Sequence, residues 1–142
     1  MTDQLKASAI VKMMYDNDAF SQWLGIEIVE IAPGSCQLRM VVRPEMLNGF
    51  GTSHGGITFS FADSALAFAS NSHGQKAVSI ETSISHLKPV IAGDILTARV
   101  VEQSKQYRIA LYEILVENQA GTLVAVFRGT VYRKSELWEM TE

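Results

Sequence analysis

Several residue types are scarce in this chain of 142 residues, and each scarcity excludes something. Cys36 is the only cysteine, so no disulfide can form within the chain and a reducing compartment is expected. An excess of basic residues is also missing, because 12 Lys and Arg stand against 15 Asp and Glu, which gives a net charge of −3. Broad nucleic-acid binding needs a basic face that displaces counterions, so this balance argues against it.

A long apolar run is absent from the start of the sequence. The opening segment, MTDQLKASAIVKMMYDND, is interrupted by Lys6, Lys12 and Asp16, so it predicts neither a signal peptide nor a membrane-spanning helix. We therefore expect a cytoplasmic protein. Linker-like, repeated and low-complexity stretches are missing too, while 47% of the residues are hydrophobic. A single domain over residues 1–142 follows.

The chain does contain a helical pattern, followed by alternating ones. Apolar spacing predicts a helix over residues 5–15, and a short helical turn over 19–24 completes an N-terminal helical segment, residues 1–24. Alternation then predicts a β-hairpin made of residues 26–32 and 36–42. After a central helix, four long strands are expected, at residues 77–90, 95–103, 107–118 and 123–133.

This order of elements predicts an α+β fold in which a long central helix is wrapped by an antiparallel sheet of about five to six strands. One helix covers only one face of such a sheet and leaves the sheet edges open. Association with a second copy is the simplest way to protect them, so we expect a homo-oligomer.

The central helix, expected over residues 57–71, carries one acid, Asp63. At 100° per residue, one wide side of the helix is apolar, and Asp63 falls on the remaining stripe of small or polar residues, with Ser60, Ser64, Ala67, Ser70 and Asn71. Burial of an unpaired carboxylate is costly. We therefore expect the stripe to face a cavity, water or a partner, where Asp63 can meet a ligand.

The glycines before this helix form a second feature. N–H groups in the first turn of a helix lack intrahelical partners, and the helix dipole favours negative charge there, so a carbonyl oxygen docked beside Gly55 would be polarised. Asp63 lies about 12 Å further along the helix, too far to reach the same carbonyl. Two antiparallel helices from two chains could bring Gly55 and Asp63 together. Without further information, His54 can also be a helix cap or a hydrogen-bonded loop histidine, and Asn48 can be an ordinary turn residue.

The stretch LNGFGTSHGGITFSFADSALAFASNS, residues 47–72, resembles the signature of the hotdog-fold acyl-CoA thioesterases, in particular of the phenylacetate-degradation (PaaI) type. HLKPVIAGD and VFRGTVYR resemble later strands of that family, so the resemblance covers nearly the whole chain. It implies a hotdog fold and hydrolysis of an acyl-CoA thioester without a cofactor. It also implies a dimer with active sites shared between subunits, and further assembly to a tetramer.

The resemblance also implies roles for single residues. Asp63 matches the catalytic carboxylate, as nucleophile or as general base on water, and Gly55 matches the residue whose backbone N–H polarises the thioester carbonyl. His54 and Asn48 match the pair that orients the loop. Substrate contacts are expected from Ser79, Phe50, Phe59 and Leu47, around an aryl-acetyl group or a medium aliphatic chain. Candidate contacts for the CoA phosphates are Lys88, Lys105, Arg108, Arg128 and Arg133.

Two other functions are compatible with the same residues. A hotdog dehydratase or hydratase would use His54 and Asp63 as a pair for proton removal next to a thioester carbonyl. A non-catalytic acyl-CoA-binding module would have no need of the acid. The sequence contains no G-x-S-x-G, no H-E-x-x-H and no glycine-rich phosphate loop ending in Lys-Ser/Thr, so it predicts neither a serine hydrolase nor a metal or nucleotide cofactor.

Overall fold

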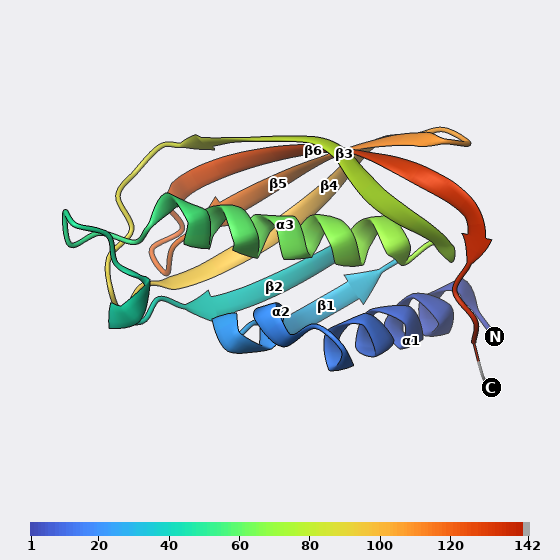
Figure 1. The fold of residues 1–142 in the computed structure, drawn as a ribbon, viewed down its shortest axis with the longest axis horizontal. Coiled ribbons are helices and arrows are strands. Elements are labelled where there is room, and N and C mark those ends of the chain that lie inside the picture. The colour runs from blue at the N-terminus through green and yellow to red at the C-terminus, as the bar shows by residue number, and fades with distance from the viewer. Residues whose placement is uncertain (141–142) are drawn as a thin grey trace.

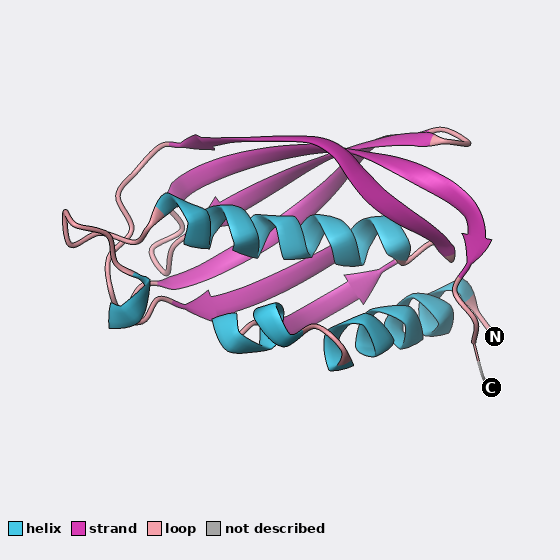
Figure 2. Cartoon of the chain, viewed as in Figure 1, coloured by secondary structure: helices cyan, strands magenta, loops and turns pink. Residues whose placement is uncertain are grey.

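The structure, a computed structural model, describes residues 1–140. All the predicted helices and strands are present (Figure 2), with ends shifted by a few residues. In chain order they are α1 (Asp3–Asp16), α2 (Ala19–Leu24), β1 (Glu27–Ala32), β2 (Ser35–Val41), the 3-10 turn η1 (Pro44–Met46), α3 (Gly55–Asn71), β3 (Gln75–His86), β4 (Ile95–Lys105), β5 (Ile109–Glu117) and β6 (Leu123–Leu137).

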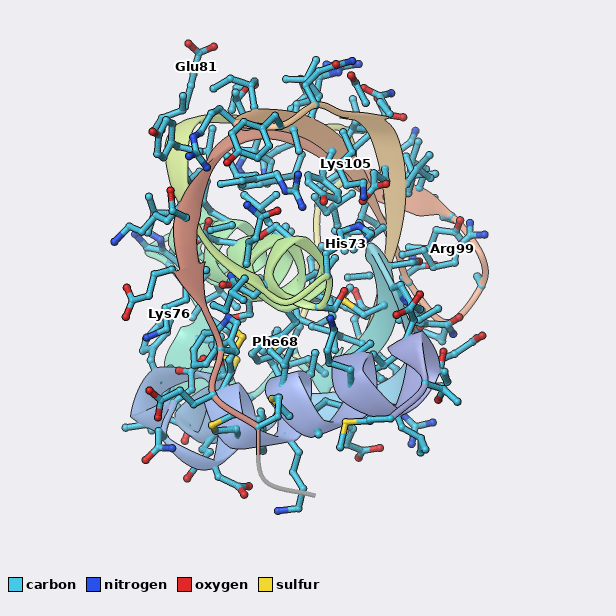
Figure 3. All side chains as sticks on the ribbon, turned by 90° about the vertical axis from the view of Figure 1, so that its right-hand side faces the viewer. Phe68, His73, Lys76, Glu81, Arg99 and Lys105 are labelled. Atoms are coloured by element: carbon cyan, nitrogen blue, oxygen red, sulfur yellow. The ribbon has the colours of Figure 1, made fainter. Side chains whose placement is uncertain are left out.

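The strands form one six-stranded antiparallel sheet in the order β1-β2-β4-β5-β6-β3. The sheet curves around α3, and α1 and α2 lie on the side of α3 that the sheet leaves open (Figures 1 and 3). The α+β fold with a wrapped central helix is therefore confirmed. Strands β1 and β3 are the two edges of the sheet, and β3 is the strand that directly follows α3 in the chain.

The core lies between α3 and the concave face of the sheet. The helix contributes fully buried side chains such as Phe61, Leu66 and Phe68. Leu66 packs directly on Gly129 of β6, where an added Cβ atom would lie only 2.5 Å from Cδ2 of Leu66. A glycine at this position therefore lets the helix approach the sheet closely, and this contact fixes how α3 sits in the sheet.

The N-terminal helices close the remaining side of α3. Both helices have a side-chain N-cap: Thr2 Oγ1 accepts from Leu5 N at 3.1 Å, and Asp18 Oδ1 accepts from Ser21 N at 2.9 Å. Ile10 is fully buried beneath α3. No helix within residues 1–140 is long and apolar enough to cross a membrane.

Candidate active site

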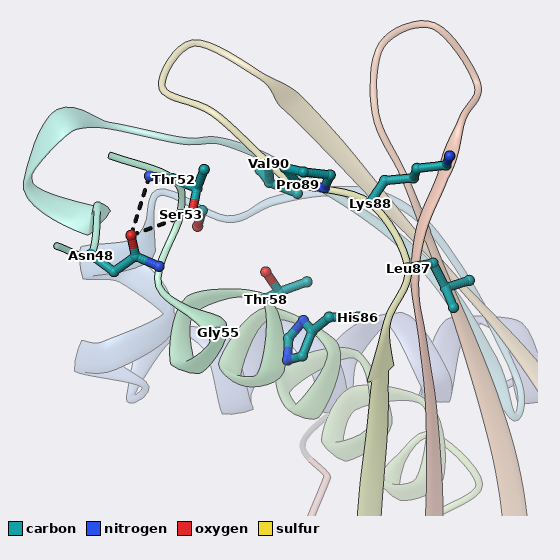
Figure 4. Close-up of a pocket in the computed structure, with 10 residues that line it drawn as sticks. All are labelled: Asn48, Thr52, Ser53, Gly55, Thr58, His86, Leu87, Lys88, Pro89 and Val90. Atoms are coloured by element: carbon teal, nitrogen blue, oxygen red, sulfur yellow. Dashed lines mark hydrogen bonds between the residues drawn. The ribbon is translucent and has the colours of Figure 1, made fainter. Parts of the chain in front are cut away.

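The loop before α3 is organised by Asn48. Its side-chain oxygen accepts a hydrogen bond from Phe50 N at 2.9 Å. It also accepts from Thr52 N at 3.2 Å and from Thr52 Oγ1 at 3.3 Å (Figure 4). The far end of the loop is attached to the body of the protein, since Ser53 N donates to Val90 O at 2.6 Å and His54 N donates to Met46 O at 2.8 Å. Asn48 thus holds the loop closed through these hydrogen bonds.

Helix α3 begins at Gly55, two residues earlier than predicted, because both glycines join its first turn. His54 is the N-cap, and its Nδ1 accepts from Gly56 N at 2.9 Å. Nδ1 must be unprotonated to accept, so the ring proton lies on Nε2. The N–H of Gly55 donates to no acceptor within residues 1–140. This free donor at the positive end of the helix dipole suits a carbonyl oxygen.

A cavity of about 410 Å³ opens in front of this helix start (Figure 4). Its lining includes Gly55, Asn48 and Thr58, and on the other side the segment that leaves β3, from His86 to Val90. His86 lies against Gly55, because a Cβ atom added to Gly55 would lie 3.2 Å from Nε2 of His86. The ring therefore forms a wall of the cavity beside Gly55.

Neither His86 nor Thr58 was predicted as a site residue. Thr58 counted as a polar exception on the apolar side of the helix, yet it is 3% exposed and lines the cavity. His86 lies 31 residues after Gly55, and no local pattern in the sequence relates the two. Only the curvature of β3 and its exit from the sheet bring the ring over the helix start.

Asp63 lines a different cavity, of about 240 Å³, together with Ser79 of β3. Its side chain is half-buried, and within residues 1–140 its carboxylate accepts no hydrogen bond and pairs with no cation. Burial raises the pKa of Asp63 above its ordinary value of 3.8 because the charged form loses solvation. Half-buried, unpaired and open to a cavity, this carboxylate is suited to bind or to react rather than to stabilise the fold.

The single chain therefore keeps the predicted catalytic residues apart. Gly55 and Asn48 share the first cavity, with His54 at its edge as the helix cap, whereas Asp63 and Ser79 share the second. The helical rise between Gly55 and Asp63 is about 12 Å, as the sequence predicts.

The prediction that the polar stripe of α3 faces a cavity, water or a partner was wrong at two positions, since Ser64 and Asn71 are buried against other elements of the chain. Ser70 is buried too, but it lines the cavity of Asp63. Ser64 is covered by α2, and its hydroxyl lies 2.8 Å from the hydroxyl of Ser21. Asn71 is covered by β3 and Trp138, and its Oδ1 accepts from Ala77 N and from Trp138 Nε1. A helical wheel cannot foresee such coverage, because it contains no information about neighbouring elements.

The apolar residues expected around the acyl group lie elsewhere in the single protomer. Phe50 is at the tip of the loop and is 93% exposed. Leu47 and Phe59 are half-buried against the core, where Phe59 makes an edge-on contact with Phe127 at 5.1 Å between ring centroids. None of the three lines either cavity, whose apolar residues are instead Leu87, Pro89 and Val90 in the first and Leu66, Val78 and Val131 in the second.

The candidate phosphate contacts are dispersed. Lys88 lines the cavity of Gly55, whereas Arg128 pairs with Glu113 at 3.3 Å on the sheet. Arg108 donates to Ser135 Oγ at 2.7 Å. Lys105 and Arg133 line a third cavity. Within residues 1–140, no group of three or more His, Cys, Asp or Glu side chains is placed to hold a metal ion.

Comparison with known proteins gives consistent matches. Residues 50–134 match the family described as the thioesterase superfamily. The sequence is 42% identical over 120 residues to the acyl-coenzyme A thioesterase PaaI of Escherichia coli, covering 84% of this chain and 86% of that protein. It is 33% identical over 136 residues to human acyl-coenzyme A thioesterase 13, covering 92% and 94%.

Solved structures agree with the sequence matches. The E. coli PaaI protein from the phenylacetic acid degradation operon superposes with a TM-score of 0.93 at 38% identity, covering 96% of this chain and 99% of that one. The smu.793 protein of Streptococcus mutans, solved bound to acetyl CoA, superposes with a TM-score of 0.77 at 26% identity, covering 80% and 91%.

Proposed function

Since this chain belongs to the thioesterase superfamily and is an acyl-CoA thioesterase with the hotdog fold, we propose that it hydrolyses aryl-acetyl-CoA esters at a site completed by two subunits. The observation that carries the proposal is the separation of a free backbone donor, Gly55 N–H, from an unpaired carboxylate, Asp63, in two cavities of one protomer. Each cavity holds half of the groups that thioester hydrolysis needs.

The edge strand β3 supports the pairing of two chains. Val78 and Ile80 on this strand are 46% and 58% exposed, and Val78 lines the cavity of Asp63. A second copy that pairs with β3 would extend the sheet and cover these side chains. With the two α3 helices antiparallel, Gly55 of one protomer would then approach Asp63 of the other.

We also propose that two dimers associate into a tetramer. The outer face of the sheet carries exposed apolar side chains among its ion pairs, including Val101, Leu111 and Tyr132, each between 40% and 47% exposed. An apolar face of this kind is more typical of an interface than of a fully solvated surface.

The chemistry follows from the two groups. The thioester oxygen accepts from Gly55 N–H, which draws electron density away from the carbonyl carbon. Asp63 then removes a proton from water as the water oxygen bonds to that carbon, and the tetrahedral oxyanion remains on the Gly55 N–H. Its collapse breaks the C–S bond, and the CoA thiolate leaves and takes up a proton. A thiolate is a good leaving group, so no strong general acid is required.

Direct attack by Asp63 is the second route to the same products. The carboxylate oxygen would bond to the carbonyl carbon, the thiolate would leave, and water would then hydrolyse the resulting mixed anhydride. Both routes need an ionised Asp63 next to the carbonyl. They differ in whether a covalent mixed anhydride with Asp63 forms, and an oxygen of Asp63 enters the product only if water attacks the Asp63 carbonyl carbon of that anhydride.

The choice of acyl group rests on the relatives and on the shape of the site. The E. coli relative is the acyl-coenzyme A thioesterase PaaI, a protein from the phenylacetic acid degradation operon. Leu87, Pro89 and Val90 give the first cavity an apolar wall that an aromatic ring can contact. In a dimer, the exposed Phe50 would face the partner and could close the acyl pocket. A medium aliphatic chain would suit the same surfaces.

The dehydratase alternative has less support. It requires His54 to act as a base beside Asp63, but Nδ1 of His54 already accepts from Gly56 N–H and is not available to take a proton. A pure binding module does not account for an unpaired, half-buried acid in a cavity.

A panel of acyl-CoA esters tests the proposal. Thiol release would be measured with a thiol-reactive dye from acetyl-, octanoyl-, phenylacetyl- and hydroxyphenylacetyl-CoA. We expect the wild type to favour the aryl-acetyl esters and Asp63→Asn to lose activity with the oligomer intact. Glu81→Gln, which changes an exposed acid on β3, is the matched control. Undiminished hydrolysis by Asp63→Asn would contradict the site, and a preference for acetyl-CoA would contradict the substrate.

A further inference from the structure

A small polar cavity of about 170 Å³ lies near the end of α3 opposite to Gly55. It collects charged side chains from four parts of the chain: Asp3 and Lys6 of α1, His73 after α3, Lys105 of β4 and Arg133 of β6. Figure 3 views this end of the molecule, with His73 and Lys105 labelled beside the end of the helix. The cavity shares no lining residue with the cavities of Gly55 and Asp63.

The three permanent cations of this cavity are not neutralised by the protein. Within residues 1–140, Lys6, Lys105 and Arg133 have no carboxylate oxygen within 4.0 Å. The nearby acid Glu102 is already engaged, because His73 Nε2 lies 2.6 Å from its Oε2 and Tyr112 donates to the same oxygen at 2.8 Å. The lining therefore has a positive excess, with Asp3 as its single acid.

The strongest indication that this cavity binds an anion comes from the hydrogen-bond donors of Arg133. The side chain is only 7% exposed, so it holds a buried charge. One end of the guanidinium is satisfied, since Nη1 donates to Gln106 O at 2.8 Å and lies 3.4 Å from Tyr107 O. Nε is buried without any acceptor, and Nη2 donates to no acceptor within residues 1–140. A buried charged donor without a partner is costly, so this arrangement calls for an acceptor.

Nε and Nη2 form one edge of the planar guanidinium. This is an edge with which arginine binds two oxygens of a carboxylate or phosphate at once. Lys6 and Lys105 line the same cavity and would supply further positive charge to such a group. The volume accommodates a phosphate group but not an acyl-CoA molecule, so the ligand must be a small anion or the anionic end of a larger one.

We propose that this cavity is an oxyanion site that binds a phosphate group, separate from the thioesterase centre, in which the unpartnered edge of Arg133 and the amines of Lys6 and Lys105 hold the anion. The phosphate can be inorganic phosphate or a phosphate monoester carried by a larger molecule. The proposal is independent of the acyl-group preference proposed above.

Direct binding of inorganic phosphate to the full chain is the test. Isothermal titration at constant ionic strength, with chloride balancing the added phosphate, should give saturable binding to the wild type. Lys105→Gln and Arg133→Lys should each weaken it about tenfold or more, the latter because lysine keeps the charge but loses the two-donor edge. Lys134→Gln, an exposed cation on the same strand, is the control and should bind like the wild type.

Further titrations identify the source of the phosphate. If CoA displaces inorganic phosphate and 3′-dephospho-CoA does not, the ligand is a phosphate monoester of that kind. If neither displaces it, the site is one for free phosphate. Absence of saturable binding to the wild type would overturn the proposal. Equal weakening by Lys134→Gln and Lys105→Gln would overturn it too, since that would show general charge attraction. Neither result would bear on thioester hydrolysis.

Discussion

Gly55 and Asp63 belong to the same helix, yet they line two different cavities of one protomer. The free backbone N–H at the helix start and the unpaired carboxylate two turns later cannot act on one carbonyl within a single chain. The proposed site therefore lies between two chains. In a symmetric dimer with antiparallel α3 helices, each Gly55 N–H would approach the Asp63 carboxylate of the other subunit.

Activity should depend on pH through Asp63. The carboxylate acts only when ionised, and burial raises its pKa above 3.8, so kcat/KM should fall as the pH drops through a midpoint above that value. At higher pH the same limb should reach a plateau. The pH dependence of phenylacetyl-CoA hydrolysis measures this, and an acid limb that is also present in the residual activity of Asp63→Asn would assign it to another group.

Asp63 should also lower stability at neutral pH. Because its pKa in the folded protein is raised, the protonated form is the one that folding favours; the associated stability is present below the unfolded-state pKa and is lost as the pH rises through the folded-state value. Asp63→Asn should therefore have a higher thermal midpoint than the wild type at pH 7. At a pH below the unfolded-state pKa the two proteins should melt together. Equal midpoints at pH 7 would mean that the acid is paired in the assembled protein.

His86 should act through its shape. Its ring packs beside Gly55 in the first cavity, and thiolate departure needs no strong acid, so the ring should matter more than its nitrogens. His86→Phe should keep kcat within about threefold of the wild type, whereas His86→Ala should lower kcat/KM about tenfold because the carbonyl is held less tightly. Steady-state kinetics distinguish the two variants. A Phe variant as impaired as the Ala variant would show that a ring nitrogen takes part in the reaction.

Gly129 should tolerate no larger side chain. A Cβ atom there would lie 2.5 Å from Leu66, so Gly129→Ala should cost about 1–3 kcal/mol in the free energy of unfolding measured with urea. Gly49→Ala is the control, because nothing lies within 4 Å of an added Cβ and its φ is not positive. Adding Leu66→Ala to Gly129→Ala should remove the clash and give strong coupling between the two substitutions. Strictly additive losses would show that the contact does not limit the helix position.

The fold was largely predictable because its signals are local. Helical spacing in α1, strict alternation in β2 and β4 to β6, and the glycines before α3 each act over a few residues, and the structure contains all of these elements. The 12 Å between Gly55 and Asp63 follows from helical geometry alone, so the division of the site between two cavities was also within reach of the sequence.

What the sequence did not indicate depends on contacts between distant segments. Ser64 has the character of an open polar position until α2 covers it through Ser21. His86 becomes part of the site only because the end of β3 lies beside the start of α3. Phe50 lies outside both cavities because the loop closed by Asn48 points its tip into solvent. Tertiary placement decides these three cases, and residue type alone does not.

Complementation between two inactive variants tests the shared site. Gly55→Pro removes the N–H and keeps the backbone conformation, because Gly55 is the first helical residue and His54 has φ −58° and ψ 136°, which suit a residue before proline. Gly55→Ala keeps the N–H and controls for the added Cβ. Gly55→Pro and Asp63→Asn should each be inactive alone, but their mixed dimers contain one intact site, so co-assembled protein should recover about a quarter of wild-type activity. A mixture that forms mixed dimers and stays as inactive as its parents would contradict a site shared between subunits.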